Sequence, residues 1–286
     1  MFFGWFFDQE STPCRVILLP FKKGGRLDPG NWRPISLVNV DYKIASRAIA
    51  GRLMKVIHLV VNCDQSCCVP GRILWGKTVA LLRTVVNYAT LANVPVAILP
   101  LDQEKAFDRV DWGFFKSVLV HMGFGLSFFG WENLFYSGVE SAVKVNCYFT
   151  HFFKLSRGVR QGCPLSPLLY VLYAEVLACS FRANPRNRRL LLPGASFPLS
   201  VMSQYADDTS LAVTSTDVIK VVFDTYAFSA SGSGSRLNQV KSKSLWLGSW
   251  FGLGVRNAQD IWDFLWLWGC GRDELASTYC GCEKCP

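Results

Sequence analysis

Residues 199–213 read LSVMSQYADDTSLAV, two apolar runs around the acidic pair Asp207 and Asp208. Leu199–Ala206 and Thr209–Val213 are each typical of a strand, and two residues between strands are the usual spacing of a tight hairpin. Adjacent carboxylates repel each other unless a cation lies nearby. The stretch therefore predicts an acidic hairpin that is either a solvated turn or a cation site.

A second apolar run, Val94 to Asp102, predicts a strand that ends in a carboxylate. If this strand lies beside the hairpin, Asp102 and Asp207 converge, and Mg²⁺ prefers such oxygen ligands. Two ions held there would stabilise the attacking and leaving oxygens of a phosphoryl displacement. Pro100 lacks an amide hydrogen, so the strand needs a bulge or an unpaired edge at that position.

Apolar residues at helical spacing predict helices around these strands. One starts at Asp41 as its N-cap, a second carries Phe114 to Met122, and a third opens with Ser166 and Pro167 and runs to about Phe181. Long helices mixed with antiparallel strands predict an α+β fold around a small sheet.

Basic residues are concentrated in two parts of the chain, whose formal net charge is +9. Arg15 to Arg72 holds ten basic residues against three acidic ones, and Lys154 to Arg189 holds seven against one. Clustered cations are favoured by the phosphates of a nucleic acid. An ordinary solvated surface remains the alternative.

No membrane segment or export signal is expected. Met1–Phe7 is apolar but short and uncharged, and the apolar run Cys163–Phe181 is interrupted by Pro164, Pro167 and Glu175. We therefore expect an intracellular protein of the cytoplasm or nucleus. The sequence leaves the oligomeric state open.

Eleven cysteines, most of them single residues in apolar surroundings, indicate a reducing compartment. The spacing of the four tail cysteines matches no common zinc pattern. They are Cys270, Cys280, Cys282 and Cys285.

Five short motifs occur in a fixed order along the chain. They are WRPISL at 32–37, VPGR at 69–72, LDQEKAFD at 101–108, GVRQGCPLSP at 158–167 and YADD at 205–208. Together they resemble the reverse transcriptases of non-long-terminal-repeat retrotransposons over residues 15 to 248. The resemblance implies a right-hand polymerase that copies an RNA template from a DNA primer with deoxynucleoside triphosphates.

The resemblance also implies roles for single residues. Asp102, Asp207 and Asp208 match the carboxylates that bind two Mg²⁺ ions, for which Mn²⁺ can substitute. Phe107 matches the steric gate against a ribose 2′-hydroxyl, with a core aromatic as the alternative. Lys241, within a stretch similar to the next family motif, is expected to give a proton to the leaving pyrophosphate.

Further matches concern the substrates. Arg33 and Lys22 are expected to contact the triphosphate, and Gln161 and Gly162 the nucleotide and template. Arg72 and Arg160 are expected to contact the nucleic-acid backbone.

The resemblance implies interleaved domains, listed here in chain order. They are an extension at 1–14, fingers at 15–95, palm at 96–124, a helical fingers segment at 125–153, palm with the acidic hairpin at 154–248, and a divergent tail or partial thumb at 249–286. We therefore expect a fragment with an incomplete thumb.

Two other functions stay open. One is a catalytically inert remnant that still binds nucleic acid, and sequence hardly separates it from an active enzyme. The other is an intron-maturase-like splicing helper on the same fold, which the motif wording favours less.

Overall fold

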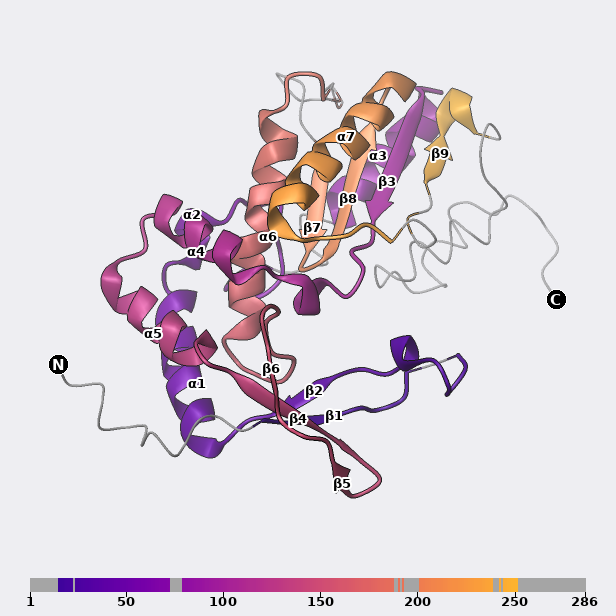
Figure 1. Ribbon diagram of the computed structural model, residues 1–286. Coiled ribbons are helices and arrows are strands. Elements are labelled where there is room, and N and C mark those ends of the chain that lie inside the picture. Colours follow the sequence, from indigo (N-terminus) through magenta and orange to yellow (C-terminus); the bar gives the residue numbers. More distant parts are fainter. Residues whose placement is uncertain are drawn as a thin grey trace.

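The computed structural model describes residues 15–22, 24–72, 79–187, 190, 192, 201–238, 242 and 244–251. Within them lie two sheets and the helices around them (Figure 1). The helices are α1 (Val40–Met54), α2 (Ile57–Val60), α3 (Val79–Leu91), α4 (Trp112–His121), α5 (Leu126–Tyr136), α6 (Ser166–Ala183) and α7 (Thr216–Ser233), with short 3-10 helices at Pro29–Asn31, Ala106–Arg109 and Gly248–Trp250.

The first sheet joins the N-terminal region to the middle of the chain. Its strands are β1 (Arg15–Leu18), β2 (Ile35–Leu37), β4 (Glu140–Val145), β5 (Tyr148–Phe149) and β6 (Phe153–Lys154). They are ordered β2-β1-β4-β5, with β6 also paired to β4, and β1 runs parallel to β4. Parallel neighbours need a long crossover, which here is the intervening chain of more than a hundred residues.

The second sheet carries the acidic hairpin. It contains β3 (Val96–Leu101), β7 (Met202–Tyr205), β8 (Asp208–Val213) and β9 (Leu245–Leu247) in the order β7-β8-β3-β9, all antiparallel. Side chains of α3 pack against one face of β3, and those of α6 and α7 pack against the other. This four-stranded sheet is therefore sealed on both faces.

The α+β expectation is confirmed, and most expected elements form. The predicted strand becomes β3, the acidic stretch becomes the β7–β8 hairpin, and the three predicted helices become α1, α4 and α6. The turn of the hairpin is Ala206–Asp207 and not the expected Asp207–Asp208, because Asp208 is the first residue of β8. Two expected caps are wrong. Asn39, and not Asp41, precedes α1, while Ser166 lies inside α6 with Leu165 at the cap position.

Pro100 is accommodated at an unpaired edge. It pairs in register with Ser210 of β8, but the pairing of β3 with β9 ends at Ile98. Beyond Ile98, β3 therefore has a neighbouring strand on one side, and the missing amide hydrogen of proline is tolerated there.

No described helix is long and apolar enough to cross a lipid bilayer. The tail beyond residue 251, with its four cysteines and the expected partial thumb, lies outside the described residues.

Candidate active site

Asp102 and Asp208 occupy neighbouring positions on adjacent strands. The last residue of β3, Leu101, pairs with Thr209 of β8, so the next position brings Asp102 alongside Asp208. Residues opposite each other in an antiparallel pair project from the same face of a sheet. In Figure 1 this end of the four-stranded sheet points toward the five-stranded sheet.

Asp207 lies in the turn of the β7–β8 hairpin. Tyr205 pairs with Asp208, so Ala206 and Asp207 form the turn between them. Ala206 adopts φ of 53°, a left-handed conformation that is disfavoured for residues with a side chain. Such a turn needs support from its surroundings.

Gln65 provides that support. Its side-chain oxygen accepts a hydrogen bond from the amide of Ala206 at 3.0 Å, and its amide group donates to the Ala206 carbonyl at 3.4 Å. Its backbone neighbours pair with β7: the amide of Gln204 donates to Asp64 and the amide of Ser66 donates to Gln204. A loop more than 130 residues away in sequence thus braces the acidic turn.

Among the described residues, no group of three or more His, Cys, Asp or Glu side chains is arranged to hold a metal ion. Mg²⁺ is usually bound by one or two carboxylates together with water and substrate phosphates, and not by an all-protein cage. The carboxylates of Asp102 and Asp208 on neighbouring strands fit that donor set.

The loop after β3 is held by the segment that follows α7. The amide of Asn238 donates to the Asp102 carbonyl at 2.8 Å, and the Asp102 amide donates to the Ser242 hydroxyl at 3.1 Å. The Glu104 amide donates to the Arg236 carbonyl at 2.7 Å. This segment leads into Lys241, which lies outside the described residues, so its expected role stays a prediction.

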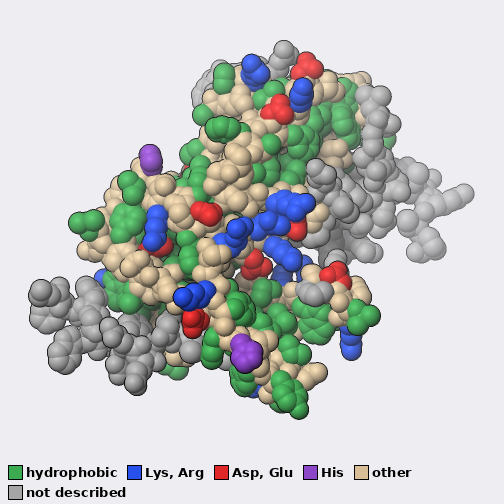
Figure 2. Space-filling model, viewed as in Figure 1, with side chains coloured by type: hydrophobic (Ala, Val, Ile, Leu, Met, Phe, Trp, Pro, Cys, Tyr) green, Lys and Arg blue, Asp and Glu red, His purple; other side chains and the backbone are tan. Residues whose placement is uncertain are grey.

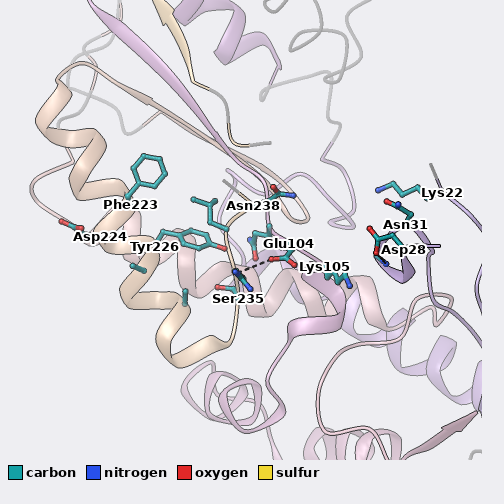
Figure 3. A pocket seen from close by; sticks show the side chains of 16 residues that line it. Lys22, Asp28, Asn31, Glu104, Lys105, Phe223, Asp224, Tyr226, Ser235 and Asn238 are labelled. Carbon is teal, nitrogen blue, oxygen red and sulfur yellow. Dashed lines mark hydrogen bonds and ion pairs between the residues drawn. The ribbon is translucent and has the colours of Figure 1, made fainter. Parts of the chain in front are cut away.

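A cleft of about 1080 Å³ opens beside this loop (Figure 3). Its walls come from the β1–β2 connection, the turn after Asp102, helix α7 and the segment at 235–238. The charged residues that line it are Lys22, Asp28, Glu104, Lys105, Asp224 and Arg236. Figure 2 shows Lys and Arg side chains gathered around the hollow between the upper and lower parts of the molecule, with acidic groups among them.

Part of this charge is already compensated. Glu104 forms ion pairs with Arg109 at 3.3 Å and with Arg236 at 3.4 Å. Lys22 and Lys105 line the cleft from two different segments, the β1–β2 connection and the turn after Asp102 (Figure 3). A polyanionic ligand entering the cleft would meet both cations.

Phe107 packs against Tyr170 of α6, and Tyr170 lies close to the acidic turn. The two rings stack with centroids 4.7 Å apart, and the Tyr170 hydroxyl donates to the side chain of Gln103 at 3.1 Å. Burial raises the pKa of Tyr170, and the charges of Asp207 and Asp208 raise it further. The tyrosine therefore stays a neutral donor beneath the acids.

Gln161 and Gly162 lie between α6 and β2. The Ser36 amide donates to the Gln161 carbonyl at 2.9 Å, and the Gln161 amide group donates to Asp108 at 3.4 Å. Gly162 has φ of 105°, and a Cβ there would lie 3.0 Å from the Ser36 carbonyl oxygen. Glycine is required for this approach. Arg33 is exposed just before β2.

Arg72 and Arg160, which were expected to contact the nucleic-acid backbone, both bind protein groups. Arg72 is half-buried and donates to the backbone carbonyls of Asn62, Gln65 and Val61. It holds the loop that carries Gln65, which makes it a structural residue.

Arg160 is 5% exposed, and its guanidinium stacks between Tyr42 and Tyr136 while donating to the Phe135 carbonyl. Burial lowers the pKa of Arg160 to about 9. A side chain enclosed in this way does not reach a backbone phosphate, so the expected contact is corrected.

Two residues of this site carry no signal that the sequence reasoning used. Gln65 is a single glutamine whose partner lies 141 residues away, and Tyr170 is one aromatic among many on a buried helix. The sequence feature that could have pointed to Gln65 is its position four residues before the start of the VPGR motif.

A model of the family described as reverse transcriptase (RNA-dependent DNA polymerase) matches residues 21–265. The chain is 39% identical over 239 residues to the transposon TX1 uncharacterized 149 kDa protein of Xenopus laevis, covering 82% of this chain and 18% of that protein. It is 27% identical over 175 residues to the retrovirus-related Pol polyprotein from type-1 retrotransposable element R2 of Popillia japonica, covering 61% of this chain and 24% of that protein. The chain thus spans less than a quarter of the length of either relative.

Solved structures with a similar fold include two of telomerase from Candida tropicalis. The apo form truncated from its C-terminal domain has a TM-score of 0.57 at 14% identity, covering 82% of this chain and 50% of that chain. The complex with the TWJ fragment of telomeric RNA has a TM-score of 0.55 at 13% identity, covering 82% of this chain and 41% of that chain. The likeness concerns the fold, and it confirms the expected right-hand arrangement.

Proposed function

The chain belongs to the reverse transcriptase family, and from that premise we propose that it extends a DNA primer on an RNA template. Deoxynucleotides are added to the primer 3′-hydroxyl, and pyrophosphate is released. The observation that carries the proposal is the register of β3 with β8, which sets Asp102 beside Asp208 next to the turn of Asp207.

In this proposal Asp102, Asp207 and Asp208 hold two Mg²⁺ ions, or Mn²⁺ in their place. Bound ions would lower the charge on the phosphates and favour attack by the primer hydroxyl. Gln65 keeps the turn in place by its bonds to Ala206. The ligands that the three side chains do not supply come from water and the triphosphate.

The cleft is the proposed entry site of the triphosphate. Lys22 and Lys105 line it. Arg33, which is exposed, is a further proposed contact of the triphosphate. Phe107, fixed by its stack on Tyr170, is the proposed barrier to a ribose 2′-hydroxyl. Lys241 is the proposed proton donor to the leaving pyrophosphate.

Residues 15–95 and 125–153 form the proposed fingers, and residues 96–124 and 154–248 form the proposed palm. Helix α3, within the proposed fingers, packs against β3 of the four-stranded sheet. The template and primer would lie between them, where basic side chains gather (Figure 2). Because its proposed substrates are RNA and deoxynucleoside triphosphates, we place the reaction inside the cell.

Primer extension on an RNA template tests the proposal. With Mg²⁺ the 286-residue chain is expected to elongate a labelled DNA primer, and Asp207→Asn is expected to reduce elongation by at least about 100-fold, a range typical for loss of a charge-stabilising group. The matched control is Asp217→Asn, an exposed acid in the first turn of α7. It should leave elongation unchanged.

The competing hypothesis is a catalytically inert remnant of such a polymerase that still binds nucleic acid. Equal signals from the chain and from Asp207→Asn, together with salt-dependent binding of the primer–template duplex, would establish the remnant and exclude the polymerase.

A further inference from the structure

Two adjacent cysteines, Cys67 and Cys68, lie in the loop that braces the acidic turn. Their sulfur atoms are 3.3 Å apart. Cys67 is buried and Cys68 is exposed. The pair therefore offers one sulfur that a reagent can reach, with a second sulfur directly behind it.

Other described thiols have different surroundings. The Cys163 thiol donates to the Tyr42 hydroxyl, and the Cys179 thiol donates to Glu175. Cys63 and Cys147 are exposed. Cys63 lies four residues before Cys67, and Cys147 lies in the turn between β4 and β5, far along the chain from the pair. The close approach of two sulfurs is a property of this loop.

The backbone of the pair is linked to the acidic turn by a single side chain. The Gln65 side-chain oxygen accepts hydrogen bonds from the amides of both Cys67 and Ala206, each at 3.0 Å. Ala206 at one end of this link has φ of 53°, and Cys68, the residue after Cys67, has φ of 57°, both disfavoured conformations. A backbone shift at Cys67 therefore acts on Ala206 through Gln65.

We propose that Cys67 and Cys68 form a reversible modification site that reacts with small disulfides of the glutathione class and closes to a Cys67–Cys68 disulfide. In the first step the Cys68 thiolate attacks one reagent sulfur, a Cys68–reagent bond forms, and the reagent disulfide bond breaks. The released thiolate takes up the proton that Cys68 lost.

In the second step Cys67 loses its proton and attacks the Cys68 sulfur, displacing the second half of the reagent as a thiol. Two cysteine thiols are oxidised and one reagent disulfide is reduced to two thiols. The short distance between the two sulfurs makes this second step intramolecular and fast relative to attack by an outside thiol.

Closure changes the local backbone. Consecutive Cα atoms lie about 3.8 Å apart, whereas residues joined by a disulfide usually lie about 4.4 to 6.8 Å apart. The peptide bond fixes the spacing of consecutive Cα atoms, so the ring closed by a Cys67–Cys68 disulfide is strained and the bond is readily reduced again. Closure therefore forces a shift in the backbone dihedrals of the two cysteines. Because the Cys67 amide is bonded to Gln65, the shift weakens the support of the acidic turn.

Mass spectrometry of the oxidised chain tests the site. After treatment with oxidised glutathione, the peptide containing residues 64–72 is expected to lose two hydrogens, about 2 Da, without keeping an adduct. Hydrogen exchange of residues 202–213 is expected to rise several-fold and to return to its initial rate after reduction. Neither readout requires polymerase activity, so failure of the proposed function leaves the test intact.

Two variants separate the steps. Cys67→Ser is expected to keep a stable adduct on Cys68, and Cys68→Ser is expected to leave the peptide unmodified. Cys63→Ser and Cys147→Ser each remove another exposed thiol, and both should leave closure unchanged. A wild-type peptide that keeps both thiols, or keeps the adduct on Cys68, overturns the site. A closed disulfide with unchanged exchange in residues 202–213 overturns its link to the turn.

Discussion

The two sheets differ in how deeply their side chains are buried. In the four-stranded sheet, Ile98 is fully buried between the layers, and the acidic turn is held by a distant loop. In the five-stranded sheet, Ile35 and Leu37 of β2 are 37% and 46% exposed. The proposed metal ligands thus lie at the end of a sheet that helices cover on both faces. Arg33, in contrast, lies just before an exposed edge strand. Ligands of a metal must be fixed closely, but a cation that meets a flexible triphosphate tolerates movement.

The largest expected effect comes from truncating the same residue type in the two sheets. Ile98→Ala in β3 leaves a cavity between α3 and the sheet, so we expect a loss of about 2 to 5 kcal/mol in the free energy of unfolding. Ile35→Ala in β2 is expected to cost about 1 kcal/mol or less. Urea unfolding followed by circular dichroism measures both, and equal losses would contradict the difference between the sheets.

The support of the acidic turn is the next test. Gln65→Ala removes the acceptor of two buried amides, those of Cys67 and Ala206. We expect a loss of about 1 to 3 kcal/mol in the free energy of unfolding, together with slower primer extension. Asn133→Ala, at an exposed position of α5, serves as the control. If Gln65→Ala unfolds like the control, the turn does not depend on this loop.

A pair of glycine substitutions tests the contact between α6 and β2. Gly162→Ala is expected to cost about 1 to 2 kcal/mol, because its φ is positive and its Cβ would press on the Ser36 carbonyl. Gly130→Ala in α5 has open space around the new Cβ and should gain up to about 1 kcal/mol from helix propensity. Thermal unfolding should therefore shift in opposite directions, and shifts of the same sign would refute this contact.

The smallest expected effect concerns Glu132 of α5, the helix that precedes β4. Burial raises its pKa above the ordinary value of 4.5, and Lys116, 3.7 Å away, offsets part of this. An acid with a raised pKa in the folded state stabilises the fold fully below pH 4.5, and this stability is lost as the pH rises through the raised pKa.

Glu132→Gln should remove this decline, which for one group is at most about 1.4 kcal/mol per pH unit. Urea unfolding at several pH values above 4.5 measures it. The same slope in the wild type and the variant would show that burial does not hold a proton on Glu132.

Local patterns predicted the elements well. The apolar run before Asp102, the acidic hairpin and the spacing from Phe114 to Met122 all became the expected strands and helix. These signals depend on neighbours within a few residues, which the sequence displays directly. The α+β class followed from their order.

Contacts between distant segments could not be predicted, because they leave no local pattern in the sequence. The bond from Gln65 to Ala206 joins residues 141 positions apart, and nothing local marks it. Arg160 was expected to contact the nucleic-acid backbone, but the rings of Tyr42 and Tyr136 enclose it. The roles of the three aspartates and of Lys241 stay predictions until the extension assay is made.

The pairing of β1 with β4 and of β3 with β8 has a consequence for synthesis of the protein. Strand β1 can complete its pairing with β4 only after residue 144 has been synthesised, and β3 can complete its pairing with β8 only after residue 213. A nascent chain leaving the ribosome therefore exposes apolar strands for much of translation. Chaperones that bind such strands, and pauses in elongation before residue 213, should affect how much correctly folded protein a cell obtains.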